Sequence, residues 1–288
     1  MSDGPSAQWL TGDRLHLQHG PIDVVTRAWG APSAVQQAYE AAIARFQTIL
    51  PELAGELTEL RKPMSERPLA ETPVARRMLA ACRPHAGSFL TPMAAVAGAV
   101  ADELIEVMTE AAPLDRAFVN DGGDIAIFLT EGETMEVALA ADFSRGAIPA
   151  LNGRVTLGYG DGIGGIATSG AQGRSFSLGI ADSVTVLARD AASADAAATL
   201  IANAVDLDHP AIQRRPAHDL DPDSDLGDRL VTVGVGDLSA ADIALALDAG
   251  RARADQLRKR GLIRDAALCL KGETITLGPF TRLRELRP

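Results

Sequence analysis

Residues 164–199 hold the side chains best suited to binding a phosphate and a metal ion. A glycine-rich turn with hydroxyl side chains comes first, and Asp195 and Thr199 follow at the start of a small-residue helix, one helical turn apart on one face. Glycine lets the backbone approach a ligand closely, and Mg²⁺ takes one or two carboxylates plus water and phosphate oxygens. The residues expected to contact the ligand are Gly165, Thr168, Ser169 and Gly170.

The start of this helix has two interpretations. Its N-terminal partial positive charge would favour a bound phosphate. However, Asp is also common in the first turn of ordinary helices, and Thr199 would then only pack. Arg174, just after the glycine-rich turn, would hold a phosphate or carboxylate of the ligand, or else form a structural ion pair.

The turn Asn120–Asp124 places two carboxylates and a carboxamide around paired glycines. Ordinary hairpin chemistry explains such a turn, because Asp and Gly dominate hairpin loops. The apolar strands on both sides would also place its polar groups at the end of a sheet, where ligands commonly bind. In that case Asp121 or Asp124 is the expected general base. The residues expected to contact the cofactor are Asn120, Gly122 and Gly123.

Three further motifs do not meet the requirements of the sites they resemble. Residues 160–165 satisfy G-x-G-x-x-G, but a strand rather than a helix is predicted to follow, which excludes a dinucleotide fingerprint. The alternating aspartates of residues 219–225 lack the Gly and Glu of a calcium loop. Cys82 lies near His85, but no orienting third residue can be identified, so a small buried hydrophobe is the favoured reading.

Composition limits the classes of function. The chain has 288 residues, 47% of them hydrophobic, and a formal net charge of −11. This length and apolar content are enough for a full core. The negative charge argues against nucleic acid or an anionic membrane as the main partner, because both need a basic surface. Two cysteines make no disulfide framework, and no apolar run is long enough to span a membrane, so a cytoplasmic protein is expected.

Patterning predicts an α+β fold, because strands come in runs rather than in strict alternation with helices. Residues 62–73 and 206–228 are predicted to be surface connectors. The predicted strands cover residues 14–26 (two strands around Gly20), 116–129 (two strands around a turn), 135–141, 154–159, 175–187, 229–235 and 266–277 (a hairpin). The predicted helices cover residues 33–61 (split at Pro51), 74–81, 92–109, 194–205 and 239–260.

The chain resembles the superfamily of the ApbE-type FAD:protein FMN transferases, and most closely a short, uncharacterised ApbE-like branch. The segments that carry the resemblance are TPMAAVAGAVADE (91–103), VNDGGDIAIFL (119–129), GIATSG (165–170), GRSFSLGIADSVTVLA (173–188) and SADAAATLIANAV (193–205). It covers nearly the whole chain and implies one ApbE-like, T-fold-like domain over residues 1–288, or two interleaved lobes, with largely antiparallel sheets and packed helices.

The transferases imply roles for individual positions. The Asp and Thr of their D-A-x-A-T helix bind magnesium, and they correspond to Asp195 and Thr199. A backbone carbonyl of their A-K-G-x-x-x-D segment completes the protein ligands and would come here from Val96. The resemblance therefore implies Mg²⁺ and a flavin, FAD or FMN, as ligands.

Two departures separate this chain from the transferases. The Lys of the A-K-G segment is replaced by Ala97, and the His of H-I-x-D-P by Gly179. Both departures argue against transfer of FMN to a protein threonine. Three functions stay open: a Mg²⁺-dependent flavin, phosphoryl or nucleotidyl transferase; a non-catalytic flavin-binding accessory protein of redox or sulfur metabolism; and another small-molecule enzyme on the same fold. A homodimer is compatible with the alanine-rich helices.

Overall fold

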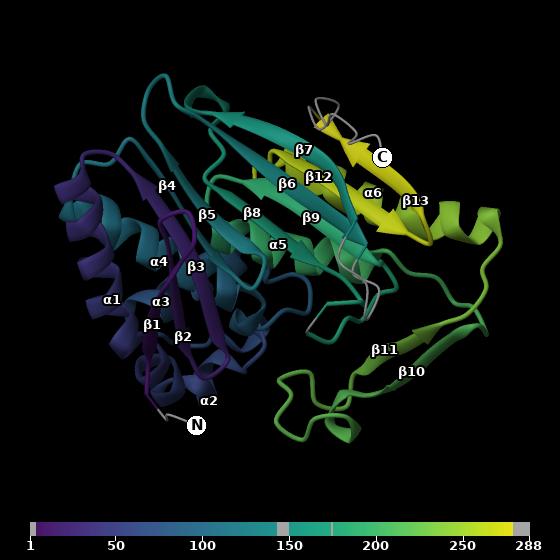
Figure 1. Cartoon of the computed structure of the whole chain (residues 1–288). Helices are drawn as coiled ribbons and strands as arrows, with labels where there is room; N and C mark the ends of the chain where they lie inside the picture. Colours follow the sequence, from purple (N-terminus) through teal and green to yellow (C-terminus); the bar gives the residue numbers. More distant parts are fainter. Residues whose placement is uncertain (1–3, 143–149, 174, 279–288) are drawn as a thin grey trace. The chain divides into compact units, whose positions relative to one another are not determined.

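The computed structural model describes residues 4–142, 150–173 and 175–278 (Figure 1). The chain forms two compact units that interleave along the sequence. The first unit comprises residues 1–135, 158–167 and 188–196, and the second comprises residues 136–157, 168–187 and 197–288. Two elements, β8 (Gly165–Ser169) and α5 (Ala191–Ala204), begin in the first unit and end in the second.

The first unit is built on an antiparallel sheet in the order β1-β2-β3-β4-β5-β8. Side chains alternate between its two faces, and one face is apolar: Leu15, Leu17, Val24 and Val119 are all buried there. The strands before β8 are β1 (Ser6–Leu10), β2 (Arg14–His19), β3 (Ile22–Trp29), β4 (Arg116–Asp121) and β5 (Asp124–Leu129).

Helices α1 and α4 pack against each other and against the strands of this sheet (Figure 1). Thr26 of β3 reaches the sulfur of Met108 on α4, which identifies the face that α4 covers. The helical elements of this unit are α1 (Pro32–Gly55), α2 (Leu57–Leu60), η1 (Met64–Glu66), α3 (Pro73–Cys82), η2 (Arg83–His85), η3 (Pro92–Ala95), α4 (Val96–Ala111) and η4 (Tyr159–Asp161).

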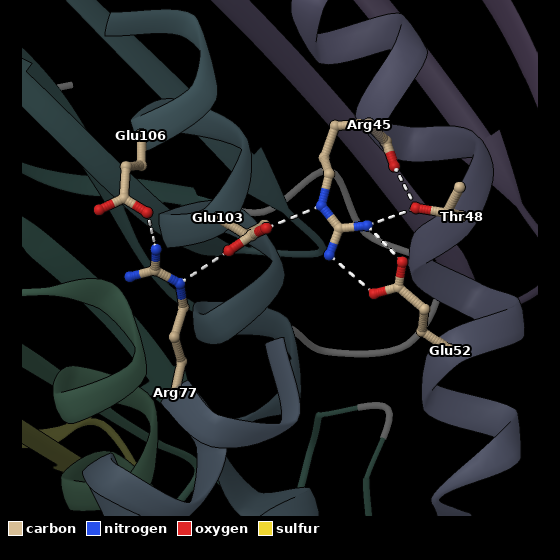
Figure 2. Close-up of polar contacts among 6 residues, drawn as sticks. All are labelled: Arg45, Thr48, Glu52, Arg77, Glu103 and Glu106. Atoms are coloured by element: carbon tan, nitrogen blue, oxygen red, sulfur yellow. Dashed lines mark hydrogen bonds and ion pairs between the residues drawn. The ribbon is translucent and has the colours of Figure 1, made fainter. Parts of the chain in front are cut away.

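An ion-pair network joins α1, α3 and α4 (Figure 2). The carboxylate of Glu103 accepts hydrogen bonds from Arg45 Nε at 2.7 Å and from Arg77 Nε at 2.9 Å. Arg45 also makes a two-point contact with Glu52, at 2.7 and 2.8 Å, and Arg77 pairs with Glu106. The side chain of Glu103 is only 6% exposed, so the network satisfies a carboxylate that burial would otherwise destabilise.

The second unit contains the antiparallel strands β9, β12 and β13 in that order, with α6 packed on β12 and β13. Strands β6 and β7 pair with each other, as do β10 and β11. The bounds are β6 (Thr134–Asp142), β7 (Ala150–Gly158), β9 (Ser183–Ala188), β10 (Ile212–Pro216), η5 (Ala217–Asp219), β11 (Leu230–Val235), α6 (Ala240–Lys259), β12 (Asp265–Leu270) and β13 (Glu273–Leu277).

The α+β class with largely antiparallel sheets is confirmed, and several local predictions are wrong. Helix α1 continues through Pro51 because its apolar stripe, with Phe46, Ile49 and Leu53 buried, packs on both sides of the proline. Residues 175–182 contain no strand, and only Ser183–Ala188 pairs as β9. The segment 206–228 includes β10, which its polar composition concealed.

We predict that Glu103→Gln lowers the free energy of unfolding by about 2 kcal/mol, because it leaves the charges of Arg45 and Arg77 less well compensated in a buried place. Urea denaturation measures the loss. The matched control is Glu106→Gln, since the Glu106 side chain is 51% exposed; it should cost less than about 1 kcal/mol. Equal losses for the two variants would contradict the central role of Glu103.

Candidate functional site

The predicted polar turn is a two-residue hairpin loop between β4 and β5. Gly122 and Gly123 have φ angles of 62° and 118°, which only glycine adopts readily, and the Oδ1 atom of Asn120 accepts a hydrogen bond from the Gly123 amide at 2.8 Å. Asp121 and Asp124 are directly opposite each other in the ladder, so their side chains share one face. The adjacent Asn120 lies on the other face. The turn therefore places two carboxylates together and directs the carboxamide away from them.

Helix α5 begins at Ala191, earlier than predicted, and carboxylates occupy its first amides. Asp102 of α4 accepts hydrogen bonds from the amides of Ala191 and Ala192 at 2.9 and 2.8 Å. Asp190 accepts one from the Ser193 amide at 2.7 Å. The prediction that this helix start would face a bound phosphate is therefore wrong, because protein carboxylates already use its donors.

Asp195 lies in the second turn of α5 and is half-buried. Its Oδ2 atom accepts a hydrogen bond from the amide of Gly98, in the first turn of α4, at 3.2 Å. Burial and the charge of Asp124 raise its pKa well above the usual range, the Gly98 bond lowers it, and the charges of Asp121 and Asp102 raise it further. The structure thus brings Asp121, Asp124 and Asp195 close enough for their charges to interact.

Asp102 is a second carboxylate with a raised pKa. Burial raises the pKa to about 7 despite the hydrogen bonds from Ala192 and Ala191, which lower it, and the charge of Asp190 raises it further. Asp102 corresponds to the Asp of the A-K-G-x-x-x-D segment of the transferases, but no role was predicted for it from the sequence. The signal that was available is its spacing of four residues from Gly98, which puts both residues on one face of α4.

Glycines near the start of α5 allow protein backbone, rather than a ligand, to approach. A Cβ atom on Gly98 would lie 2.4 Å from the Ala191 carbonyl oxygen, and one on Gly164 would lie 2.4 Å from the Arg189 oxygen. A Cβ on Gly165 would lie 2.1 Å from the carbonyl carbon of Asp190. Packing therefore accounts for these three glycines, and the contact of Gly165 with a ligand stays a prediction.

In the predicted turn 167–170, the first three residues are instead the end of strand β8, and Gly170 follows the strand. The hydroxyl of Thr168 lies 2.9 Å from that of Thr185, and Ser169 is half-buried. Gly170 has a φ of 159°, and a Cβ there would lie 2.4 Å from the Asp182 oxygen. As ligand contacts, Thr168, Ser169 and Gly170 stay predictions.

The two remaining candidate metal ligands are both half-buried. Thr199 follows Asp195 by one turn of α5, and Val96 is the first residue of α4, two before Gly98. Arg174 lies outside the described residues. Within the described ranges no group of three or more His, Cys, Asp or Glu side chains is arranged to hold a metal, so a cation here would need hydroxyl, carbonyl, water or phosphate oxygens as well.

Cys82 is a buried thiol whose sulfur lies 3.5 Å from the Thr91 carbonyl oxygen. Burial raises its pKa, and the charge of Asp195 raises it further. A thiol held in its protonated form is a poor nucleophile, so the structure supports the packing role.

No helix in the described part of the chain is both long enough and apolar enough to cross a membrane.

Comparison with known proteins assigns the chain to a family. A family model described as "AbpE bacteria" matches residues 7–276. The chain belongs to this family. The crystal structure of the ApbE protein from Thermotoga maritima aligns with 96% of this chain and 97% of its own length, with a TM-score of 0.51 and 13% identity. The ApbE-like resemblance and fold predicted from sequence are therefore confirmed.

The relatives found by sequence bear names that state no activity. A UPF0280 protein of Methanothrix thermoacetophila is 43% identical over 136 residues, which are 46% of this chain and 52% of the relative. A UPF0280 protein of Methanosarcina acetivorans is 32% identical over 194 residues, which are 66% of this chain and 72% of that protein. The chain thus spans about half the length of the first of these relatives, since the match covers 52% of that protein.

Proposed function

We propose that this ApbE-like protein binds Mg²⁺ together with a phosphate-bearing small molecule, a flavin nucleotide being the first candidate, and acts on the phosphate group. The observation that carries the proposal is the environment of Asp195. Its carboxylate is held by the Gly98 amide, yet the charges of Asp124 and Asp121 oppose its ionisation. A divalent cation would relieve this repulsion and favour the charged form.

The donors of this chain fit magnesium as a sparse site. Asp195 supplies a carboxylate, Thr199 a hydroxyl one turn later on the same helix, and Val96 a backbone carbonyl at the start of α4. Three protein oxygens leave positions for water and for phosphate oxygens, which is how Mg²⁺ is usually held beside nucleotides. When bound, the ion would neutralise charge on the phosphate.

The two carboxylates of the β4–β5 hairpin have separate tasks in the proposal. Asp121 is buried and accepts a hydrogen bond from the Asp23 amide at 3.2 Å, which anchors it to β3. Asp124 is half-buried at the start of β5 and is the better placed of the two to take a proton from a nucleophile.

We predict that Asp195→Ala abolishes Mg²⁺-dependent binding of FAD, since it removes the only carboxylate in the proposed donor set. Isothermal titration of FAD with and without Mg²⁺ measures the effect. Asp248→Ala, which removes an exposed carboxylate on α6, is the matched control and should bind as the unaltered protein does. Unchanged Mg²⁺-dependent binding of FAD by a folded Asp195→Ala variant would contradict the assignment of Asp195 as a metal ligand.

A second candidate function is a non-catalytic flavin-binding accessory protein, and one observation favours it. A Cβ atom at Gly179, where the resemblance places the active-site His of the transferases, would lie 2.1 Å from the Ala202 carbonyl oxygen. The packing at this position leaves no room for any side chain. Ala97 likewise replaces the Lys of the transferases, so binding could persist where their reaction has been lost.

A mass spectrum of the protein incubated with FAD and Mg²⁺ separates the two candidates. If the protein hydrolyses the pyrophosphate bond of FAD, with water as the nucleophile that Asp124 deprotonates, AMP and FMN appear, and Asp124→Asn slows their formation by about 100-fold, the lower range for a general base. Intact FAD released on denaturation would favour the accessory protein. Failure to bind FAD would leave another phosphate-bearing ligand, or a different enzyme on this fold.

A further inference from the structure

Helices α4 and α5 each cap the start of the other. The first four amides of a helix have no partner within it, so other groups must satisfy them. The N-cap residue of α4, Ala95, has no side-chain acceptor, and Asp195 of α5 bonds the Gly98 amide instead. In return Asp102 of α4 bonds the amides of Ala191 and Ala192 at the start of α5.

The spacing on both helices is the same. Gly98 precedes Asp102 by four residues on α4, and Ala191 precedes Asp195 by four residues on α5, so each pair lies on one helical face. Each helix therefore presents an amide and, one turn later, a carboxylate to its partner. The missing side chain of Gly98 is what allows this approach, because a Cβ there would collide with the Ala191 carbonyl oxygen.

We propose that Asp102 is the positioning residue of the candidate metal site. Its two hydrogen bonds fix the first turn of α5 to α4, so that Asp195, one turn later, lies on the Gly98 amide and beside Asp121 and Asp124. The effect of Asp102 on metal binding rests on the proposed function. The effect of Asp102 on the position of Asp195 is independent of the proposed function.

Asp190 provides an internal contrast. Its carboxylate accepts hydrogen bonds from the amide of Ser193 at the same helix start and from the side chain of Arg189, and among the described residues it has no hydrogen bond to α4. Loss of Asp190 should fray α5 without moving Asp195 away from Gly98. Loss of Asp102 should release both helices from each other.

Amide hydrogen exchange, followed by NMR, tests the inference without any ligand. The Gly98 amide should be protected in the unaltered protein, because Asp195 is its acceptor. In Asp102→Asn, the Gly98 amide should exchange at least 10-fold faster, together with Ala191 and Ala192, although Asp195 is unchanged. In Asp190→Asn, only Ser193 should lose protection. Unaltered Gly98 protection in folded Asp102→Asn would overturn the proposal.

A second measurement covers the case in which Asp102→Asn does not fold. In the unaltered protein, the amides of Gly98, Ala191 and Ala192 should share one opening free energy and one dependence on denaturant, as a single cooperative unit does. Clearly different values for Gly98 would overturn the inference.

The effect of Asp102 on metal binding is tested with Mn²⁺ as the probe and electron paramagnetic resonance as the readout. Asp102→Asn should weaken Mn²⁺ binding at least 10-fold and Asp190→Asn should not. Equal binding by both variants would overturn a positioning role in the site. If the unaltered protein binds no Mn²⁺, the proposed function fails, whereas the amide result still decides the role of Asp102.

Discussion

The structure of the candidate site depends on an exchange of carboxylates between two helix starts. Asp102 satisfies the first amides of α5, and Asp195 satisfies an amide in the first turn of α4. A carboxylate that accepts hydrogen bonds from backbone amides is among the stronger polar contacts in proteins, and leaving such donors unsatisfied inside the protein is costly. The two helices are therefore held in one register, and the position of Asp195 follows from it.

The same exchange explains why the glycines of this region are needed. Gly98 and Gly165 both lie against the backbone at residues 190–191, where any side chain would collide. The exchange of carboxylates also determines which charges the two helix dipoles stabilise. The amides at the start of α5 donate to two protein carboxylates, Asp102 and Asp190, while the start of α4 stabilises the one carboxylate that we propose as a metal ligand. Glycine content and helix starts, often taken as signs of a phosphate site, are here explained by packing and capping.

Much of the fold could be predicted from the sequence because local signals were strong. The helix predicted over 239–260 corresponds to α6, whose start is capped by Ser239 and Asp242, and Gly122-Gly123 correctly placed the β4–β5 turn. The errors came from tertiary packing that no local pattern reveals. Pro51 does not interrupt α1, and β10 is a strand in an otherwise polar segment. For the candidate site, the sequence pointed to Asp195, Asp121 and Asp124, whose roles stay predictions. The role of Asp102 depends on a contact between residues 89 or 90 apart in sequence.

The most direct test of the account is a crystal structure of the protein with Mn²⁺ and FAD, with anomalous diffraction used to locate the metal. The account predicts an anomalous peak within bonding distance of the Asp195 carboxylate, with Asp102 still bonded to the amides of Ala191 and Ala192. A bound nucleotide whose metal lies elsewhere, or an Asp195 carboxylate that remains on the Gly98 amide without any metal beside it, would contradict the account.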